Sequence, residues 1–198
     1  MTGKTVEYGG GNAVWFADGM ETPNLSFDFR GFGNKVWIGS RCFSSGSRLT
    51  LGNNCKVEIG NDSILNCLEI FAAESSSIII GENARFTWIV RIHAHESYDV
   101  TIGRDCLFAD GVWITVSDMH AIIDKKTRER INPGKSVMVG DHVWIGASSS
   151  VLKGSRIGSG AVIGAGSIVS GEIASDCIAA GVPARVLRSG VEWVNELS

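Results

Sequence analysis

Four histidines, at positions 93, 95, 120 and 142, are the side chains of this sequence best suited to acid–base or metal chemistry. Imidazole has an ordinary pKa near neutral pH, so it can accept a proton from a weak nucleophile or ligate zinc. His93 and His95 stand two residues apart, which places both on one face if their segment is a strand. His120 follows Asp118 in a polar stretch, where a single histidine is usually a solvated surface residue. The role of each histidine therefore depends on the elements that hold it.

An aliphatic residue that recurs at every sixth position indicates what those elements are. Glycine follows the aliphatic residue in four of these hexads, and a small residue lies four positions beyond it in four. A unit of six residues is one very short strand with a tight corner, which is typical of a parallel β-helix whose coils stack their aliphatic side chains. Glycine at the corner suits a backbone with positive φ. The recurring residues are Val139, Ile145, Val151, Ile157, Ile163 and Val169.

Upstream, the same pattern continues in a looser form. Four Ile-Gly pairs begin at positions 38, 59, 80 and 102, at intervals of 21, 21 and 22 residues. Each interval is one coil of three hexads with a few extra residues at a corner, so the early coils are irregular. Between Thr115 and Ser136 the pattern stops in a basic stretch that includes Lys125 and Arg130. We interpret residues 116–136 as a projecting loop, and such loops on rigid scaffolds often carry function.

The pattern predicts a single domain over residues 1–198. Residues 1–34 form an N-terminal cap with irregular first coils, residues 35–178 form the β-helix and residues 179–198 form a C-terminal cap. Within this cap, residues 191–197 are expected to form a short helix that covers the last coil.

Composition excludes several classes of protein. The 198 residues are 44% hydrophobic and 20% charged, enough to build a sizeable core. No apolar run approaches the roughly 18 residues of a membrane span and no secretory signal is apparent, so we expect a cytoplasmic protein. Five cysteines without close pairs fit reduced thiols better than disulfides or a metal site. A net charge of −3 makes nucleic acid an improbable partner.

The segment from Val137 to Arg188 resembles the C-terminal half of the hexapeptide-repeat acyltransferases, in particular the branch of sugar O-acetyltransferases. The resemblance covers residues 99–190 well and weakens before them. It implies an all-β fold, a left-handed parallel β-helix of about seven to eight coils. It also implies a homotrimer that binds acetyl-CoA, as a co-substrate, in the groove between neighbouring subunits.

In this family the catalytic histidine ends the coil that precedes the projecting loop, a place that His120 fills here. The resemblance thus implies that His120 takes the proton of a sugar hydroxyl as the oxygen attacks the thioester carbonyl. Asp118 or a backbone carbonyl would hold the other ring nitrogen. A backbone N–H after the Trp-Ile-Gly run, from Gly146 or Ala147, would stabilise the oxyanion. Trp144 would pack against the pantetheine arm or a sugar face, or else only against a neighbouring subunit.

The family's contacts with the cofactor carry over unevenly. Ala165 matches the small residue whose backbone meets the pantetheine, and Arg185 matches the arginine that approaches the CoA phosphates. The Thr-Lys pair usual in the family is Ser170-Gly171 here, so a cationic contact is missing. Lys153 or Arg188 would have to replace it.

His93 and His95 lie one coil before the coil of His120, in register with Thr115 and Ser117. They either meet the acceptor substrate or form part of a polar outer face.

We therefore predict an acetyl-CoA-dependent O-acetyltransferase that acts on a sugar unit of a surface polysaccharide or its precursor, by direct transfer. Transfer to an amine is an alternative within the family. A zinc enzyme similar to the γ-carbonic anhydrases is a second alternative, although Lys125 stands where that family has a histidine. A non-catalytic β-helix scaffold is a third.

Overall fold

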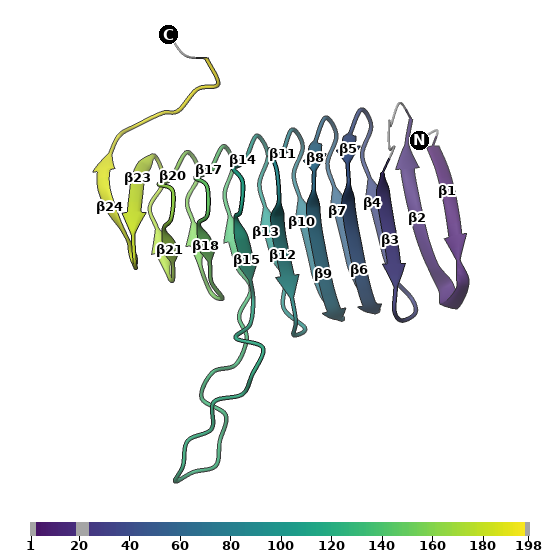
Figure 1. The fold of residues 1–198 in the computed structure, drawn as a ribbon, viewed down its shortest axis with the longest axis horizontal. Helices are drawn as coiled ribbons and strands as arrows, with labels where there is room; N and C mark the ends of the chain where they lie inside the picture. The colour runs from purple at the N-terminus through teal and green to yellow at the C-terminus, as the bar shows by residue number, and fades with distance from the viewer. Residues whose placement is uncertain (1–2, 19–23, 197–198) are drawn as a thin grey trace.

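The chain winds into a parallel β-helix whose three faces are three sheets, A, B and C (Figure 1). The structure is a computed structural model that describes residues 3–18 and 24–196. The solenoid makes about seven turns, and the predicted all-β, left-handed parallel β-helix is confirmed. Each coil contributes one short strand to each sheet, so residues about twenty positions apart lie side by side.

The strands occur in a fixed rotation from sheet A to B to C along the regular coils. Sheet A contains, in spatial order, β1 (Gly3–Tyr8), β2 (Asn12–Ala17), β4 (Lys35–Ile38), β7 (Lys56–Ile59), β10 (Ser77–Ile80), β13 (Val100–Ile102), β16 (Val137–Val139), β19 (Arg156–Ile157) and β22 (Glu172–Ile173). Sheet B contains β5 (Phe43–Ser45), β8 (Ile64–Asn66), β11 (Arg85–Phe86), β14 (Leu107–Phe108), β17 (Trp144–Ile145), β20 (Val162–Ile163), β23 (Cys177–Gly181) and β24 (Ala184–Ser189). Sheet C contains β3 (Leu25–Phe29), β6 (Ser47–Asn53), β9 (Leu68–Glu74), β12 (Val90–Ala94), β15 (Trp113–Thr115), β18 (Ser150–Val151) and β21 (Ile168–Val169). A 3-10 turn, η1 (Gly9–Gly11), joins β1 to β2.

The core is a column of side chains stacked along the solenoid axis. The recurring aliphatic residues, such as Ile145 and Ile163, are fully buried and pair in register between neighbouring coils. In the irregular early coils two phenylalanines, Phe86 and Phe108, fill the same column and stack with ring centroids 4.9 Å apart. The small residues at the fourth position are also fully buried, as the narrow corners require; these are Ser149, Ser155, Ala161 and Ser167.

The corner glycines are needed for a different reason from the one predicted. Gly60 and Gly103, which follow the aliphatic residues, are not among the residues with positive φ. A Cβ atom on Gly60 would instead lie 2.4 Å from the backbone nitrogen of Glu82 in the next coil. The expectation of positive φ at these positions was therefore wrong, because close stacking of successive corners, rather than backbone conformation, excludes a side chain there.

Both ends of the solenoid are closed by an antiparallel strand. β1 pairs with β2 at the N-terminal edge of sheet A, and β24 pairs with β23 at the opposite end of sheet B. Such strands cover edges that would otherwise be open to another chain. Coil pairing begins at β2, before residue 35, and continues through β23.

The predicted C-terminal helix is wrong for the residues that the structure describes. Residues 191–196 run in irregular conformation after β24, and Leu197 lies outside the described residues. The indole of Trp193 stacks on the ring of His142, with centroids 4.3 Å apart and planes 7° apart. Its Nε1–H donates to the carbonyl oxygen of His142 at 2.8 Å. This anchoring to the outside of the solenoid takes the place of a helical cap.

Candidate active site

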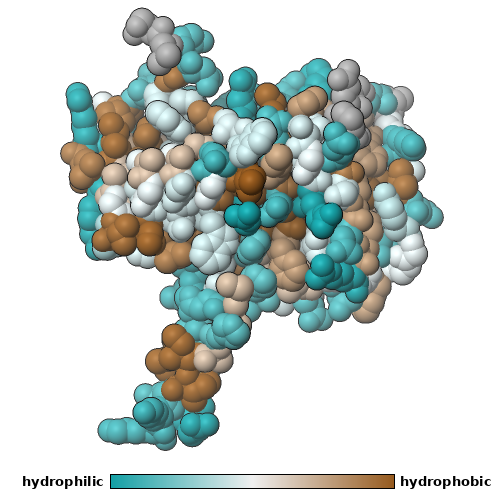
Figure 2. Space-filling view, in the orientation of Figure 1, coloured by the Kyte–Doolittle hydropathy of each residue, from teal (hydrophilic) through white to brown (hydrophobic). Residues whose placement is uncertain are grey.

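The projecting loop leaves the solenoid between β15 of sheet C and β16 of sheet A, as the break in the hexads predicts (Figure 1). It folds back on itself as an irregular hairpin, with a bridge between Ile123 and Arg130. Four exposed apolar side chains lie on it, and Figure 2 shows a hydrophobic patch partway along its length. Their exposed fractions range from 38% to 62%; they are Met119, Ile122, Ile123 and Ile131. A loop with this surface is suited to packing against another subunit.

His120 lies at the base of this loop and is exposed. Its backbone N–H donates to the carbonyl oxygen of Asp118 at 2.7 Å, and its own carbonyl accepts a hydrogen bond from Nδ2 of Asn132 at 2.9 Å. Met119, between them, has a φ of 63°, an uncommon value for a residue with a side chain. The imidazole ring makes no hydrogen bond within residues 3–18 and 24–196. The backbone of His120 is thus fixed while its ring remains open to a substrate.

Asp118 does not hold the His120 ring in this structure. Its carboxylate accepts hydrogen bonds from Nζ of Lys153 at 2.5 Å and from Nδ2 of Asn132 at 2.8 Å. The hydrogen bond from Lys153, followed by that from Asn132, lowers the pKa of Asp118 from its ordinary value. The predicted contact between the Asp118 carboxylate and the ring is absent from the described residues; both of the hydrogen bonds that the carboxylate accepts, from Lys153 and Asn132, are to its Oδ2.

Lys153 is correspondingly less available for CoA than the sequence suggested. Its Nζ also donates to the carbonyl oxygen of Asn132 at 3.1 Å, and only 20% of its side chain is exposed. The ammonium group holds the loop to the coil that follows it. A role in binding the CoA phosphates would require it to leave these two acceptors.

A second ion pair anchors the loop to the coil that precedes it. The carboxylate of Glu96 receives two hydrogen bonds of 2.8 Å from the guanidinium of Arg130. The hydroxyl of Ser117 donates to the same carboxylate and accepts the backbone N–H of Met119. The bond from Arg130, followed by that from Ser117, lowers the pKa of Glu96 to about 2. Paired hydrogen bonds of this kind fix orientation as well as distance.

Sequence reasoning missed Glu96, Arg130 and Asn132 as members of the site. Arg130 was noticed only as part of a basic stretch, although it contacts a glutamate 34 positions away. Asn132 is 8% exposed and serves His120, Asp118 and Ile122 at once. The sequence carries no signal for this, because neither spacing nor motif connects these residues.

The corner that follows Trp144-Ile145 separates the two predicted oxyanion donors. The N–H of Gly146 donates to the carbonyl oxygen of Ile163 at 2.7 Å, as part of the ladder between coils. Gly146 is buried, and a Cβ on it would lie 2.6 Å from the nitrogen of Ala165. The N–H of Ala147 has no acceptor within the part of the chain that the structure describes. Of the two, only Ala147 has a donor free to point at a ligand.

The remaining predicted cofactor residues fall into two places. Ala165 is exposed and lies on the same corner as Ala147, one coil further, where the N–H of Gly166 donates to the Ala147 carbonyl at 2.8 Å. Trp144 points outward from β17 with 39% exposure, 6.1 Å from the ring of Trp193. Arg185 is exposed on β24, and its Nη1 donates to the carbonyl oxygen of its neighbour Ala184 at 2.9 Å. The structure thus brings Ala147 and Ala165 together and leaves Arg185 at the C-terminal end.

Within one chain, His120 and the Ala147 corner lie on opposite sides of the face formed by sheet C: His120 where this face meets sheet A, and Ala147 where it meets sheet B. The loop leaves sheet C after β15, on the edge where Lys153 follows β18, whereas Ala147 precedes β18. A substrate that touched both groups at once would have to span the width of this sheet.

His93 on β12 and His95, directly after this strand, have half-buried rings whose centroids are 5.3 Å apart. His93 is paired with Thr115, as its position in the sequence predicts, and its Nδ1 accepts a hydrogen bond of 3.3 Å from Nε1 of Trp113. His95 packs on Phe71, and its Nε2 is buried with no hydrogen-bond partner in the described part of the chain. Burial lowers the pKa of both imidazoles, which favours their neutral forms.

The described residues contain no group of three His, Cys, Asp or Glu side chains that could hold one metal ion. They also include no helix that is long and apolar enough to cross a membrane.

Comparison with known proteins identifies relatives that match part of this chain. Residues 136–171 match the family model described as bacterial transferase hexapeptide (six repeats). A polysialic acid O-acetyltransferase of Escherichia coli O1:K1 is 33% identical over 125 residues, which are 63% of this chain and 40% of that protein. A Saccharomyces cerevisiae protein named as an acetyltransferase is 30% identical over 148 residues, 70% of this chain and 73% of its own.

A solved structure extends the likeness to three dimensions. The polysialic acid O-acetyltransferase OatWY matches with a TM-score of 0.83 and 28% identity, covering 91% of this chain and 88% of that one. The chain nevertheless spans less than half of the E. coli relative.

Proposed function

The chain belongs to the hexapeptide-repeat acyltransferases, and from this we propose that it transfers the acetyl group of acetyl-CoA to a hydroxyl of a carbohydrate. The observation that carries the proposal is that the chain presents two unoccupied groups, the imidazole of His120 and the backbone N–H of Ala147. Relatives that are named as O-acetyltransferases of a sialic acid polymer support a saccharide hydroxyl as the acceptor rather than an amine. The acceptor is a unit of a surface polysaccharide or of its precursor, and the enzyme works in the cytoplasm.

The reaction is one direct transfer. His120 accepts the hydroxyl proton while the oxygen attacks the carbonyl carbon of the thioester. The negative charge that develops on the carbonyl oxygen is stabilised by the Ala147 N–H. The intermediate then collapses, the carbon–sulfur bond breaks, and the imidazolium returns its proton to the leaving thiolate. No acyl-enzyme is formed, because the acceptor oxygen itself is the nucleophile.

The enzyme acts as a homotrimer with sites between subunits. His120 and Ala147 of one chain lie on opposite edges of sheet C, so a site that uses both draws them from two chains. The exposed isoleucines of the projecting loop supply the apolar surface for that contact. Trp144 and Ala165 lie beside Ala147 and line the path of the pantetheine. Arg185 approaches the CoA phosphates, where Lys153 is already paired with Asp118.

Asp118 serves the reaction as a positioning residue through the loop backbone and its contact with Asn132. His93 and His95 line the acceptor side of the same site, one coil before the loop. The buried Nε2 of His95 is without a partner among the described residues. As an unpaired buried polar atom is costly, a sugar hydroxyl at this position would satisfy it.

The test is acetyl transfer from acetyl-CoA to a panel of oligosaccharides, with His120→Ala beside the unchanged protein. We expect turnover to fall by roughly 10²-fold to 10⁴-fold while CoA still raises the melting temperature. Equal turnover in the two proteins would exclude His120 as the base. A failure of CoA to shift the melting temperature of the unchanged protein would exclude the acyl-CoA reaction altogether.

A further inference from the structure

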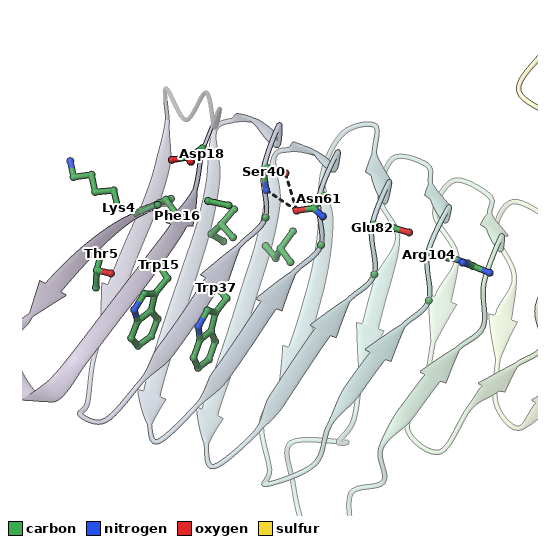
Figure 3. Close-up of a pocket in the computed structure, with 18 of the residues that line it drawn as sticks. Lys4, Thr5, Trp15, Phe16, Asp18, Trp37, Ser40, Asn61, Glu82 and Arg104 are labelled. Carbon is green, nitrogen blue, oxygen red and sulfur yellow. Dashed lines mark hydrogen bonds between the residues drawn. The ribbon is translucent and has the colours of Figure 1, made fainter. Parts of the chain in front are cut away.

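A cavity runs along the N-terminal half of the solenoid, away from the residues assigned above. It is a trough of about 1140 Å³ along the edge where sheet A turns into sheet B (Figure 3). Its lining comes from seven neighbouring strands or their following corners, from Lys4 on β1 to Asp141 after β16. Seven strands at the usual spacing of about 4.8 Å give a length of roughly 29 Å.

The shape of the trough suits a linear chain rather than a compact ligand. The lining residues follow one another along seven neighbouring strands, so the trough has room for a chain that lies parallel to the solenoid axis. The length that one pyranose unit adds to a glycan is similar to the distance of about 4.8 Å between neighbouring strands. Each coil therefore faces about one unit of a chain that lies along the solenoid axis.

An aromatic wall marks the N-terminal end of the trough. Trp15 and Trp37 stack in parallel, with centroids 4.7 Å apart and planes 9° apart (Figure 3). Trp37 is 36% exposed. The Nε1–H of each indole makes no hydrogen bond to any described residue. Nζ of Lys35 lies over the Trp15 ring and Nζ of Lys56 over the Trp37 ring, 5.5 and 5.6 Å from the ring centroids. The indoles therefore offer a saccharide their ring edges and free N–H groups rather than open faces.

Polar groups with unused hydrogen-bonding capacity continue the trough beyond the indoles. Oδ1 of Asn61 is occupied by Ser40, but its Nδ2 has no acceptor within the described residues. The carboxylate of Glu82, one coil further, accepts no hydrogen bond from the described residues and forms no ion pair with them. Figure 3 shows Asn61, Glu82 and Arg104 at successive coils along the trough. Hydroxyl groups can both donate to and accept from such side chains.

The charges of the trough favour an uncharged chain. Two cationic side chains, Lys4 and Arg104, face three anionic ones, Asp18, Glu82 and Asp141. Arg104 and Asp141 already form an ion pair at 3.4 Å. A surface of mixed sign exerts little attraction on a polyanion.

We propose that this trough binds an uncharged stretch of the acceptor polysaccharide, remote from the unit that is acetylated. The inference rests on the proposed function for its purpose, because a polymer held here must continue to the catalytic loop. The loop ends at Ser136, and Asp141 lines the trough on the far side of β16. These residues are separated by roughly 17 Å of extended chain, a span of a few sugar units.

The first arm of the test measures binding without acetyl-CoA, by titration calorimetry with maltohexaose, cellohexaose, chitohexaose and a sialic acid hexamer. We expect at least one uncharged hexasaccharide to bind, and Trp37→Ala and Glu82→Gln each to weaken it about tenfold. Trp88→Ala is the matched control, because Trp88 is 56% exposed and lies outside the trough. His120→Ala should bind as the unchanged protein does.

Four results of this first arm would overturn the proposal, and three of them concern uncharged chains and Trp37. These are the absence of binding by every uncharged hexasaccharide, equal effects of Trp37→Ala and Trp88→Ala, and a change of oligomeric state on Trp37→Ala in sedimentation, which would make the trough a protein interface. Tighter binding of the sialic acid hexamer than of any uncharged chain would contradict the charge argument and overturn it too.

The second arm measures acetyl transfer to acceptors of different length. Trp37→Ala should raise KM about tenfold for a long acceptor and leave kcat for a disaccharide unchanged. An equal effect on both acceptors would contradict a remote chain-binding role. If no acetyl transfer occurs with any acceptor, the proposed function fails, whereas the binding arm still decides on the trough.

Discussion

The coils and the projecting loop of this protein are held in place by different kinds of interaction. In the coils, side chains such as Ile145 and Phe108 are fully buried, and backbone groups pair with the coils on either side. The loop buries almost no apolar surface and depends on Glu96–Arg130, Asp118–Lys153 and Asn132. The stability of the protein therefore lies in the coils, and the orientation of His120 lies in a few polar contacts.

This contrast explains how a repeating fold acquires one unique site. Stacked coils offer the same environment at every turn, so they supply a rigid wall but no singular chemistry. The loop interrupts the repeat once and connects to coils on both sides, at Glu96 before it and Lys153 after it. Substitutions in the two regions should then separate stability from catalysis.

The largest expected effect is on stability, from Phe86→Ala in the core. Removing a buried ring that stacks on Phe108 should lower the free energy of unfolding by roughly 3–5 kcal/mol. Denaturant unfolding measures this change, with kcat per folded molecule unaltered. Phe43→Ala, whose side chain is 42% exposed on the same sheet, is the control and should change little. Loss of kcat in a folded Phe86 variant would break the separation.

The next prediction compares substitutions at two neighbouring residues of one corner, one expected to lower kcat and the other to lower the melting temperature. Ala147→Pro removes the only N–H of the pair without an acceptor among the described residues, and kcat should fall roughly 10²-fold to 10³-fold with little change in melting temperature. Gly146→Ala should instead lower the melting temperature, because its Cβ would meet the Ala165 nitrogen at 2.6 Å. Steady-state kinetics and thermal melts of both variants test this. Normal turnover of Ala147→Pro would remove Ala147 from the mechanism.

A smaller effect is expected from Asn132→Asp. The aspartate keeps an oxygen for the N–H of Ile122 but loses the two hydrogen bonds that Nδ2 donates to Asp118 and the His120 carbonyl. Displacement of His120 should lower kcat roughly tenfold to hundredfold, with the melting temperature unchanged. Lys126→Ala, at the exposed end of the loop, is the control. An equal fall in both variants would mean that the network does not position the base.

The smallest effect is a dependence on pH confined to the loop. The pKa of Glu96 is about 2 in the folded chain against an ordinary 4.5. Its contribution is therefore complete above about pH 4.5 and is lost as the pH falls toward 2. Hydrogen exchange of residues 117–132 should be faster at pH 3 than at pH 7, after correction for intrinsic rates.

Glu96→Gln serves as the matched control for this measurement. It should show fast corrected exchange at both pH values, because the ion pair with Arg130 is absent throughout. Some pH dependence from Asp118 will remain, since its pKa is also lowered. If the corrected exchange of the unchanged protein is the same at pH 3 and pH 7, Glu96 does not anchor the loop.

The β-helix and the position of the loop could be predicted from the sequence alone. This was possible because each coil repeats one local rule, an inward aliphatic residue followed by glycine, so the period is visible without any long-range information. The register of His93 with Thr115 could be predicted for the same reason. The predicted C-terminal helix failed because no repeat governs the tail, where contact with His142 decides the conformation of Trp193.

Which groups are available for chemistry depends on contacts between distant parts of the chain, and these become visible in the folded structure. Whether Gly146 or Ala147 has a free N–H depends on a carbonyl at Ile163, in the next coil. The partner of the Asp118 carboxylate in the structure is Lys153, 35 positions later. Each donor or acceptor can make only a limited number of hydrogen bonds, so a group that is bonded within the fold is no longer free to bind a ligand. Local sequence rules carry no record of that competition.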